Sequence, residues 1–233
     1  MSRNWINYWT KKNIWGSSNI WKKNSDIYFR EIVKNFLIDD KMNILDIGCG
    51  TGELIENFNK KVNWIYGVDV SDIYIKICKK KFLDNNKIVI KKFHKNYKKL
   101  YQLKKKFSFI FCNSVVQYFS NENEIIELVK SVKKVSRKGT FFLISDVMDV
   151  KEKKNLFKFI LYSLLRGYFF LLVKQFYALR RNPKYRLLEA KYKLLHVDIH
   201  KLAKKLKPLS KKVKVIDFPF TINVNRKHIL IKF

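Results

Sequence analysis

Residues 44–56 read ILDIGCGTGELIE, and this stretch decides the fold. The apolar run over residues 43–47 predicts a buried strand, and residues 52–60 predict a helix. Three of the chain's seven glycines lie between the two elements, at Gly48, Gly50 and Gly52. Glycine lets a backbone turn tightly and approach a ligand closely. The N–H groups that open the following helix favour a bound carboxylate or phosphate.

The alternation of strands and helices continues on both sides of this stretch. Strands are predicted over residues 43–47, 64–68, 87–93, 107–112, 140–145, 212–218 and 228–233. Helices are predicted over residues 25–38, 52–60, 71–82, 121–137 and 198–206. This order predicts a doubly wound α/β fold, a mostly parallel seven-stranded sheet with helices on both faces. The last two strands have no helix between them, so we expect the last strand to be antiparallel.

The length of 233 residues predicts a single domain over residues 1–233. Residues 1–24 hold four of the five tryptophans and form an aromatic N-terminal arm. Residues 151–195 interrupt the alternation and predict a helical insertion after the fifth strand. The N-terminus has no apolar signal segment and no run is long and apolar enough to span a membrane, so the default compartment is the cytoplasm.

The net charge is +31, from 50 basic and 19 acidic residues. An excess of this size points to a polyanionic partner, either nucleic acid or an anionic membrane surface. The codon bias of an AT-rich genome is the alternative, because Lys, Asn and Ile are abundant and Ala occurs only three times. The three cysteines include no CxxC pair, so we expect no disulfide framework and no metal site.

A carboxylate follows the glycine turn at an informative distance. Asp69 ends the second predicted strand in YGVDVS, 21 residues after Gly48. A carboxylate there can accept two hydrogen bonds from ribose hydroxyls. This arrangement suits any cofactor that contains adenosine, NAD included. Read alone, Asp69 is equally a solvated turn residue or a cap for the next helix.

With these residues, the chain resembles class I S-adenosylmethionine-dependent methyltransferases of the small-molecule type 11 or 12, over about residues 25–146. LDIGCGTG corresponds to the first motif of that family, and Asp69 to its ribose-binding acid. FSFIFCNSVVQYFS resembles the fourth-strand motif. NRKHILIKF resembles the closing strand of methyltransferases that act on sugars and cell-surface glycans.

The resemblance implies S-adenosylmethionine as the cofactor. It implies that the pocket for the methionine end is shaped by Asp46, Gly48, Gly50 and Gly52. Asp69 would hold the ribose, and Asn113 and Ser114 would line the other side of the cofactor. This sequence differs from the family pattern at two places, the residue that contacts adenine and the residue that serves as general base. His94 or Asn96 stands about where the family often has Asp, and Gln117-Tyr118 replaces a frequent His.

The catalytic base is therefore not assigned. Tyr118 and Asp146 follow the fourth and fifth strands, where ligands of such sheets bind. His196 and His200 lie at helical spacing near the end of the insertion, where they are either substrate groups or ordinary surface histidines. The candidates for an aromatic contact to the sulfonium are Tyr8 and Trp9.

The acceptor is expected to be a hydroxyl of a small molecule or of a glycan or lipid-linked sugar precursor. Residues 155–179, with Arg180, Arg181, Lys184 and Arg186 nearby, suit an interfacial helix that would place the enzyme at the inner membrane surface. A buried cap or dimerisation helix is the alternative. The proline motifs of base-methylating enzymes are absent, so nucleic acid is not favoured, but RNA methylation stays open. An NAD-linked oxidoreductase and a non-enzymatic membrane- or RNA-binding module are the rival classes.

Overall fold

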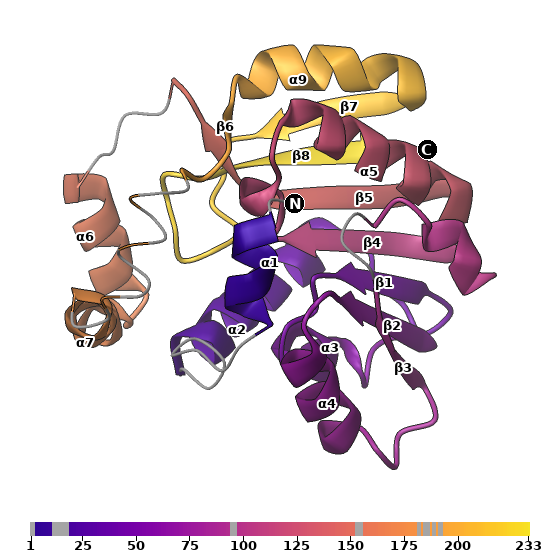
Figure 1. Cartoon of the computed structure of the whole chain (residues 1–233), viewed down its shortest axis with the longest axis horizontal. Coiled ribbons are helices and arrows are strands. Elements are labelled where there is room, and N and C mark those ends of the chain that lie inside the picture. The colour runs from indigo at the N-terminus through magenta and orange to yellow at the C-terminus, as the bar shows by residue number, and fades with distance from the viewer. Residues whose placement is uncertain are drawn as a thin grey trace.

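The computed structural model describes residues 3–10, 19–93, 97–151, 156–180 and 193–233, together with Pro183, Leu187 and Ala190. The strands of this part form one sheet with the order β3-β2-β1-β4-β5-β8-β7, and β6 pairs with β5 off this path (Figure 1). The strands are β1 (Asn43–Ile47), β2 (Trp64–Asp69), β3 (Ile88–Lys92), β4 (Phe107–Asn113), β5 (Ser136–Asp149), β6 (His196–Val197), β7 (Lys212–Ile216) and β8 (Lys227–Lys232).

Strand direction confirms the predicted fold class. All pairs among β1 to β6 are parallel, whereas β8 is antiparallel to both of its neighbours, β5 and β7. The chain therefore forms a doubly wound, mostly parallel sheet with an antiparallel last strand. The order reverses between β1 and β4, and in open sheets of this kind ligands bind at such a switch point.

Helices cover both faces of the sheet (Figure 1). One face carries α2 (Asn19–Asn35), α3 (Glu53–Phe58) and α4 (Asp72–Lys81), and the other carries α5 (Glu122–Val135) and α9 (Ile199–Leu206). Each face has its own apolar core, and β4 contributes Phe111 to the first and Ile110 to the second. Successive side chains of β4 therefore point into the two cores in turn, as expected for a strand that is buried on both faces.

Helix starts follow the capping residues that the sequence offers. The side chain of Ser71 accepts the N–H of Tyr74, and Asp198 accepts that of Lys201. Such caps satisfy N–H groups that have no partner within the helix. The helices predicted to begin at these two positions therefore begin there.

The elements differ from the prediction at several places, and α2 begins at Asn19 within the predicted arm rather than at residue 25. β6 is an eighth strand that was not predicted, because two residues show no periodicity. β5 begins at Ser136, where the helix was predicted to continue to residue 137. The N-terminal arm contains α1 (Arg3–Trp9), which lies at the carboxyl end of β4 (Figure 1).

The insertion after β5 contains α6 (Leu156–Leu165) and α7 (Phe169–Arg180), set beside α2 and away from the sheet (Figure 1). Within the described ranges, none of the helices is long and apolar enough to cross a membrane. The basic cluster predicted after α7 falls outside this part of the chain, as do the side chain of Arg180 and the two candidates for the adenine contact, His94 and Asn96.

Candidate functional site

A cavity of about 460 Å³ lies where β1, β2, β4 and β5 end at their carboxyl sides. Six of the seven residues predicted to bind a cofactor line it: Asp46, Gly48, Gly50, Asp69, Asn113 and Ser114. With Asp146 of β5, which also lines the cavity, the structure brings together groups from four strands that are up to 100 residues apart in the sequence.

The glycine turn is hydrogen-bonded to β2 and packs against Val115, in the segment that follows β4. The N–H of Gly48 donates to the carbonyl of Val68 at 2.7 Å. Gly48 has a φ of +77°, and a Cβ added there would lie 2.2 Å from Cγ2 of Val115. Glycine is required at Gly48 both by the backbone conformation and by this close approach.

Gly52, the seventh predicted cofactor residue, is not among the residues that line the cavity. It precedes α3 with a φ of +85°, and an added Cβ would lie 2.6 Å from Sγ of Cys78 on α4. The structure therefore gives this glycine a packing role between two helices. The position of Gly52 in the motif alone does not show whether its backbone lies close to a ligand or close to a neighbouring helix.

Asp69 holds the glycine turn and the start of α4 in one arrangement. Its Oδ2 accepts the N–H of Gly50 at 3.0 Å, and its Oδ1 accepts the N–H of Ser71 at 2.8 Å. Burial raises the pKa of the carboxyl, and the backbone hydrogen bonds act in the opposite direction. Each oxygen keeps a lone pair for a hydroxyl of a ligand, so Asp69 could hold a ribose.

Asp46 is a second buried carboxyl in the cavity. Burial, with repulsion from Asp69 and Glu53, raises its pKa to about 7. Its carboxylate form is therefore costly without a nearby cation. A positively charged group of a ligand would stabilise that form, which makes Asp46 suitable for the amino or sulfonium end of a cofactor.

Asn113 offers an unused hydrogen-bond acceptor at the end of β4. Its Oδ1 is buried and has no partner among the described residues, and the side chain lines the cavity. Buried polar atoms are almost always hydrogen-bonded in folded proteins. The oxygen is therefore available for a donor on a bound molecule.

Ser114, directly after β4, and Asp146, near the carboxyl end of β5, are hydrogen-bonded to each other and both have a strained backbone. Both adopt left-handed backbone conformations, with φ of +56° and +61°. Oγ of Ser114 donates to Oδ2 of Asp146 at 2.5 Å, and the buried Thr221 donates to Oδ1 at 2.6 Å. Strain of this kind persists where the surroundings enforce it, and it clusters at functional sites.

Aromatic side chains of the N-terminal arm cover one side of the cavity. The Trp9 ring lies 5.3 Å from that of Tyr118 and 6.1 Å from that of Trp21, and all three line the cavity. The carbonyl of Trp9 accepts the hydroxyl of Ser71 at 2.6 Å, which holds α1 against α4. Tyr8 packs beside Trp9 at 5.0 Å but is not a lining residue.

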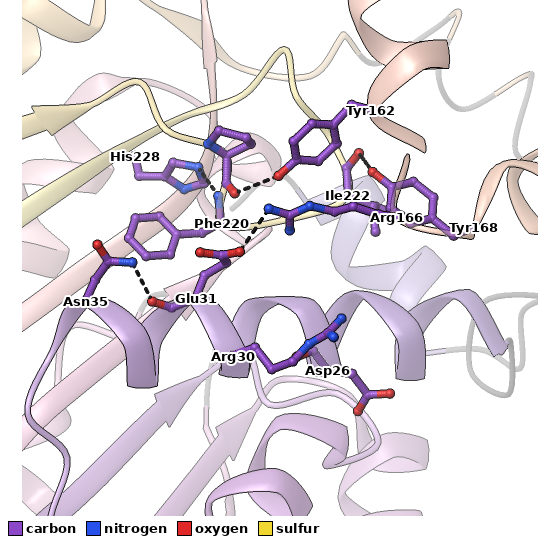
Figure 2. Close-up of polar contacts among 11 residues, drawn as sticks. Asp26, Arg30, Glu31, Asn35, Tyr162, Arg166, Tyr168, Phe220, Ile222 and His228 are labelled. Atoms are coloured by element: carbon purple, nitrogen blue, oxygen red, sulfur yellow. Dashed lines mark hydrogen bonds and ion pairs between the residues drawn. The ribbon is translucent and has the colours of Figure 1, made fainter. Parts of the chain in front are cut away.

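The structure places the predicted histidines away from the cavity. His196 and His200 are exposed, and Nδ1 of His196 lies 3.0 Å from the carbonyl of Leu194. His196 lies on β6 and His200 on α9, and neither is among the residues that line the cavity. His228 is buried, which lowers its pKa to about 4, and its Nε2 accepts the N–H of Phe220 (Figure 2).

The insertion and the loop before β8 supply the apolar end of the cavity. Phe159, Leu172 and Phe176 come from α6 and α7, and Ile222 comes from the loop. Arg226 adds a cation to this end of the lining. The cavity therefore has carboxylates and amide groups at the strand ends and a largely apolar wall opposite.

Polar contacts hold the insertion against the core (Figure 2). Arg166 forms an ion pair with Glu31 of α2 at 2.9 Å, and its guanidinium lies 4.4 Å from the centre of the Tyr162 ring. The hydroxyl of Tyr168 donates to the carbonyl of Ile222 at 3.1 Å. The apolar wall is thereby tied to α2 and to the loop before β8.

Sequence reasoning missed the residues that connect these parts. Thr221 and Asn24 lie in segments without a motif, yet Thr221 holds Asp146, and Asn24 accepts the N–H of Ile222 at 2.9 Å. Glu31 and Arg166 are separated by 135 residues, so no local pattern relates them. No cluster of His, Cys, Asp and Glu suited to a metal ion occurs in the part of the chain that the structure describes.

A family model described as a methyltransferase domain matches residues 38–211. No match is found among curated proteins.

Solved structures share the fold. PigF bound to SAH aligns with a TM-score of 0.60 at 11% identity, over 91% of this chain and 56% of PigF. Magnesium protoporphyrin IX methyltransferase (ChlM) from Synechocystis, also with SAH, aligns at 0.55 and 14% identity, over 98% of this chain and 91% of ChlM. An S-adenosylmethionine-dependent methyltransferase from Clostridium acetobutylicum aligns at 0.46 and 24% identity, over 62% of this chain and 57% of its own length. The chain thus spans little more than half of two of these proteins.

Proposed function

Because the chain belongs to the methyltransferase-domain family, whose cofactor is S-adenosylmethionine, we propose that it methylates a hydroxyl group of a small molecule with an apolar body. The observation that carries this proposal is one cavity with two chemically different ends. The polar end suits the cofactor and the apolar wall suits the acceptor.

The polar end fits S-adenosylmethionine group by group. Asp69 presents a buried carboxylate for the ribose hydroxyls. Asp46 is a carboxyl whose charged form gains from a neighbouring cation. The free oxygen of Asn113 accepts a donor from the same molecule. The bound cofactor supplies a methyl group on a sulfonium.

The opposite end supports an acceptor that is apolar over part of its surface. Phe159, Leu172 and Phe176 offer it no hydrogen bonds, so the part of the acceptor that meets them is apolar, whereas Asn223 and Arg226 of the same lining can bind a polar group beside it. An apolar alcohol or phenol, or a sugar carried on a lipid, meets the requirement.

Methyl transfer depends on holding donor and acceptor in line and excluding water. The aromatic arm and the insertion close the cavity on two sides. Asp146 lines the cavity and retains lone pairs beyond those used by Ser114 and Thr221, so it is the candidate to accept the hydroxyl proton. Tyr118, in the segment that follows β4, is the second candidate and also lines the cavity.

The test begins with the cofactor. Calorimetry with S-adenosylmethionine, S-adenosylhomocysteine and NAD should show binding of the two sulfur compounds and none of NAD, with loss of binding in Asp69→Ala. Transfer from methyl-labelled cofactor should then be detected with apolar phenols or lipid-linked sugars. NAD binding alone would overturn the methyltransferase assignment.

The acceptor part has its own test. Asp146→Asn should lower kcat while the affinity for S-adenosylhomocysteine stays within a fewfold of the wild type. Transfer to RNA, with none to any apolar acceptor, would retain the cofactor assignment and contradict the proposed acceptor.

A further inference from the structure

The two helices of the insertion expose large apolar side chains on the face turned away from the core. Phe157, Leu165 and Phe170 have exposed fractions of 76%, 78% and 81%. Other exposed apolar residues of this surface are Leu156, Leu161, Leu164, Val173, Phe176 and Tyr177. An apolar surface of this extent on a soluble domain marks an interaction site. We call the exposed apolar side chains of α6 and α7 the insertion face.

The inner side of the same helices is already used. Phe159 and Leu172 line the cavity, Ser163 is buried, and Arg166 pairs with Glu31. The helices are thus apolar on both sides, which is typical of a helix that is covered on both sides in its working state. The core covers the inner side of α6 and α7, whereas the insertion face on their outer side is exposed.

Charge restricts what that partner is. Residues 153–188, which contain both helices, include nine basic residues and no acidic one. Two such faces would repel each other, so a second copy of this chain is disfavoured. A nucleic acid would satisfy the charges but leave exposed leucine and phenylalanine side chains against phosphate or water.

We propose that the insertion face docks on an anionic lipid surface. An interfacial helix buries its apolar side chains at the boundary between headgroups and acyl chains while its cations contact anionic headgroups. Lys158 and Lys174, one on each helix, provide cations within the face. Phe176 belongs both to this face and to the cavity lining, so a docked molecule would turn the apolar end of the cavity toward the lipid.

The first test is flotation of the protein with vesicles of phosphatidylcholine, with and without phosphatidylglycerol. The variant Phe157→Ser/Leu165→Ser/Phe170→Ser removes the three most exposed side chains of the face. The matched control is Leu37→Ser/Leu83→Ser, which replaces leucines that are 84% and 79% exposed elsewhere on the surface. Melting temperature and affinity for S-adenosylhomocysteine verify that both variants are folded.

We expect wild type and control to bind the phosphatidylglycerol vesicles and the triple variant to bind at least about tenfold more weakly. Equal binding by the triple variant and the control would overturn the proposal, as would no binding by the wild type. The docking proposal does not rest on the methyltransferase assignment. Vesicle binding by a protein that binds no cofactor would support docking and contradict only the proposed function.

A second measurement serves if the triple variant does not fold. The three native cysteines are buried, so an environment-sensitive dye can be placed on Phe157→Cys or, as control, on Leu37→Cys. A blue shift with anionic vesicles only at position 157 supports docking. A shift at that position with single-stranded RNA instead, or on self-association without lipid, would overturn it.

Discussion

The carboxylate of Asp69 accepts the N–H of Gly50 at 3.0 Å, and this hydrogen bond joins the end of β2 to the turn that follows β1. The second oxygen accepts the N–H of Ser71 at the start of α4. Three chain segments therefore fix one carboxylate before a ligand arrives. Preorganisation of this kind lowers the entropy that binding must overcome.

Replacing Asp69 is expected to weaken cofactor binding. Hydrogen bonds to a charged group contribute about 1.5–3 kcal/mol each, so Asp69→Asn should lower the affinity for S-adenosylhomocysteine roughly tenfold or more. Calorimetry measures the change. Asp72→Asn is the matched control, because Asp72 is exposed and pairs with Lys92. An equal loss in both variants would contradict the role of Asp69.

Gly48→Ala should destabilise the protein through a steric clash. The added Cβ would meet Cγ2 of Val115 at 2.2 Å, and we expect a loss of about 1–3 kcal/mol in urea unfolding. Gly139→Ala is the control, since Gly139 has a φ of +87° but nothing within 4 Å of the added Cβ. Val115→Ala in the Gly48→Ala background should restore part of the loss. The clash is excluded as the cause if the two glycine variants lose equal stability.

The contribution of Asp46 to stability should fall as pH rises from about 4 to about 7, opposite in sign to that of the buried His228, whose pKa is lowered to about 4. In this window unfolded chains have released the Asp46 proton, whereas the folded protein retains it because burial raises the pKa from 3.8 to about 7. A shift of this size corresponds to on the order of 4 kcal/mol. Asp46→Asn should therefore be more stable than wild type above neutral pH, and its stability should gain on that of the wild type as pH rises through this window. Urea unfolding across pH without cofactor provides the measurement, and an unchanged slope in the variant would contradict the assignment.

The ion pair between Glu31 and Arg166 should stabilise the attachment of the insertion. Arg166→Met leaves the buried Glu31 without its cation, so we expect a loss of about 1–3 kcal/mol, larger than in Glu31→Gln/Arg166→Met. A double-mutant cycle in urea gives the coupling. The exposed pair Glu127–Lys130 is the control and should couple by less than about 0.5 kcal/mol. Equal coupling in the two pairs would show that burial adds nothing.

The parts of the fold that depend on local pattern could be predicted from the sequence. Strand runs, glycine spacing and caps such as Ser71 act over a few residues, and they set the sheet and the position of Asp69. The antiparallel last strand followed from the missing helix before it. The family resemblance then placed Asn113 and Ser114 beside the cavity that the structure contains.

Long-range pairing could not be predicted in this way. Thr221 reaches Asp146 across 75 residues, and no property of either residue in the sequence indicates the other. His196 and His200 lie at a helical spacing, which predicts a shared face, but His196 lies on β6 and His200 on α9, and both are exposed. Whether Gly52 approaches a ligand or a helix likewise depends on the packing of α4.

Because β8 lies between β5 and β7 in the sheet, the order of translation sets the order in which these strands can pair. β7 leaves the ribosome before β8 and has no strand partner until β8 follows. Thr221, which fixes Asp146, precedes β8 and gains its position only when that strand inserts beside β5. The cavity is therefore completed only after translation has reached Lys232, and a nascent chain halted earlier would carry the glycine turn without a finished site.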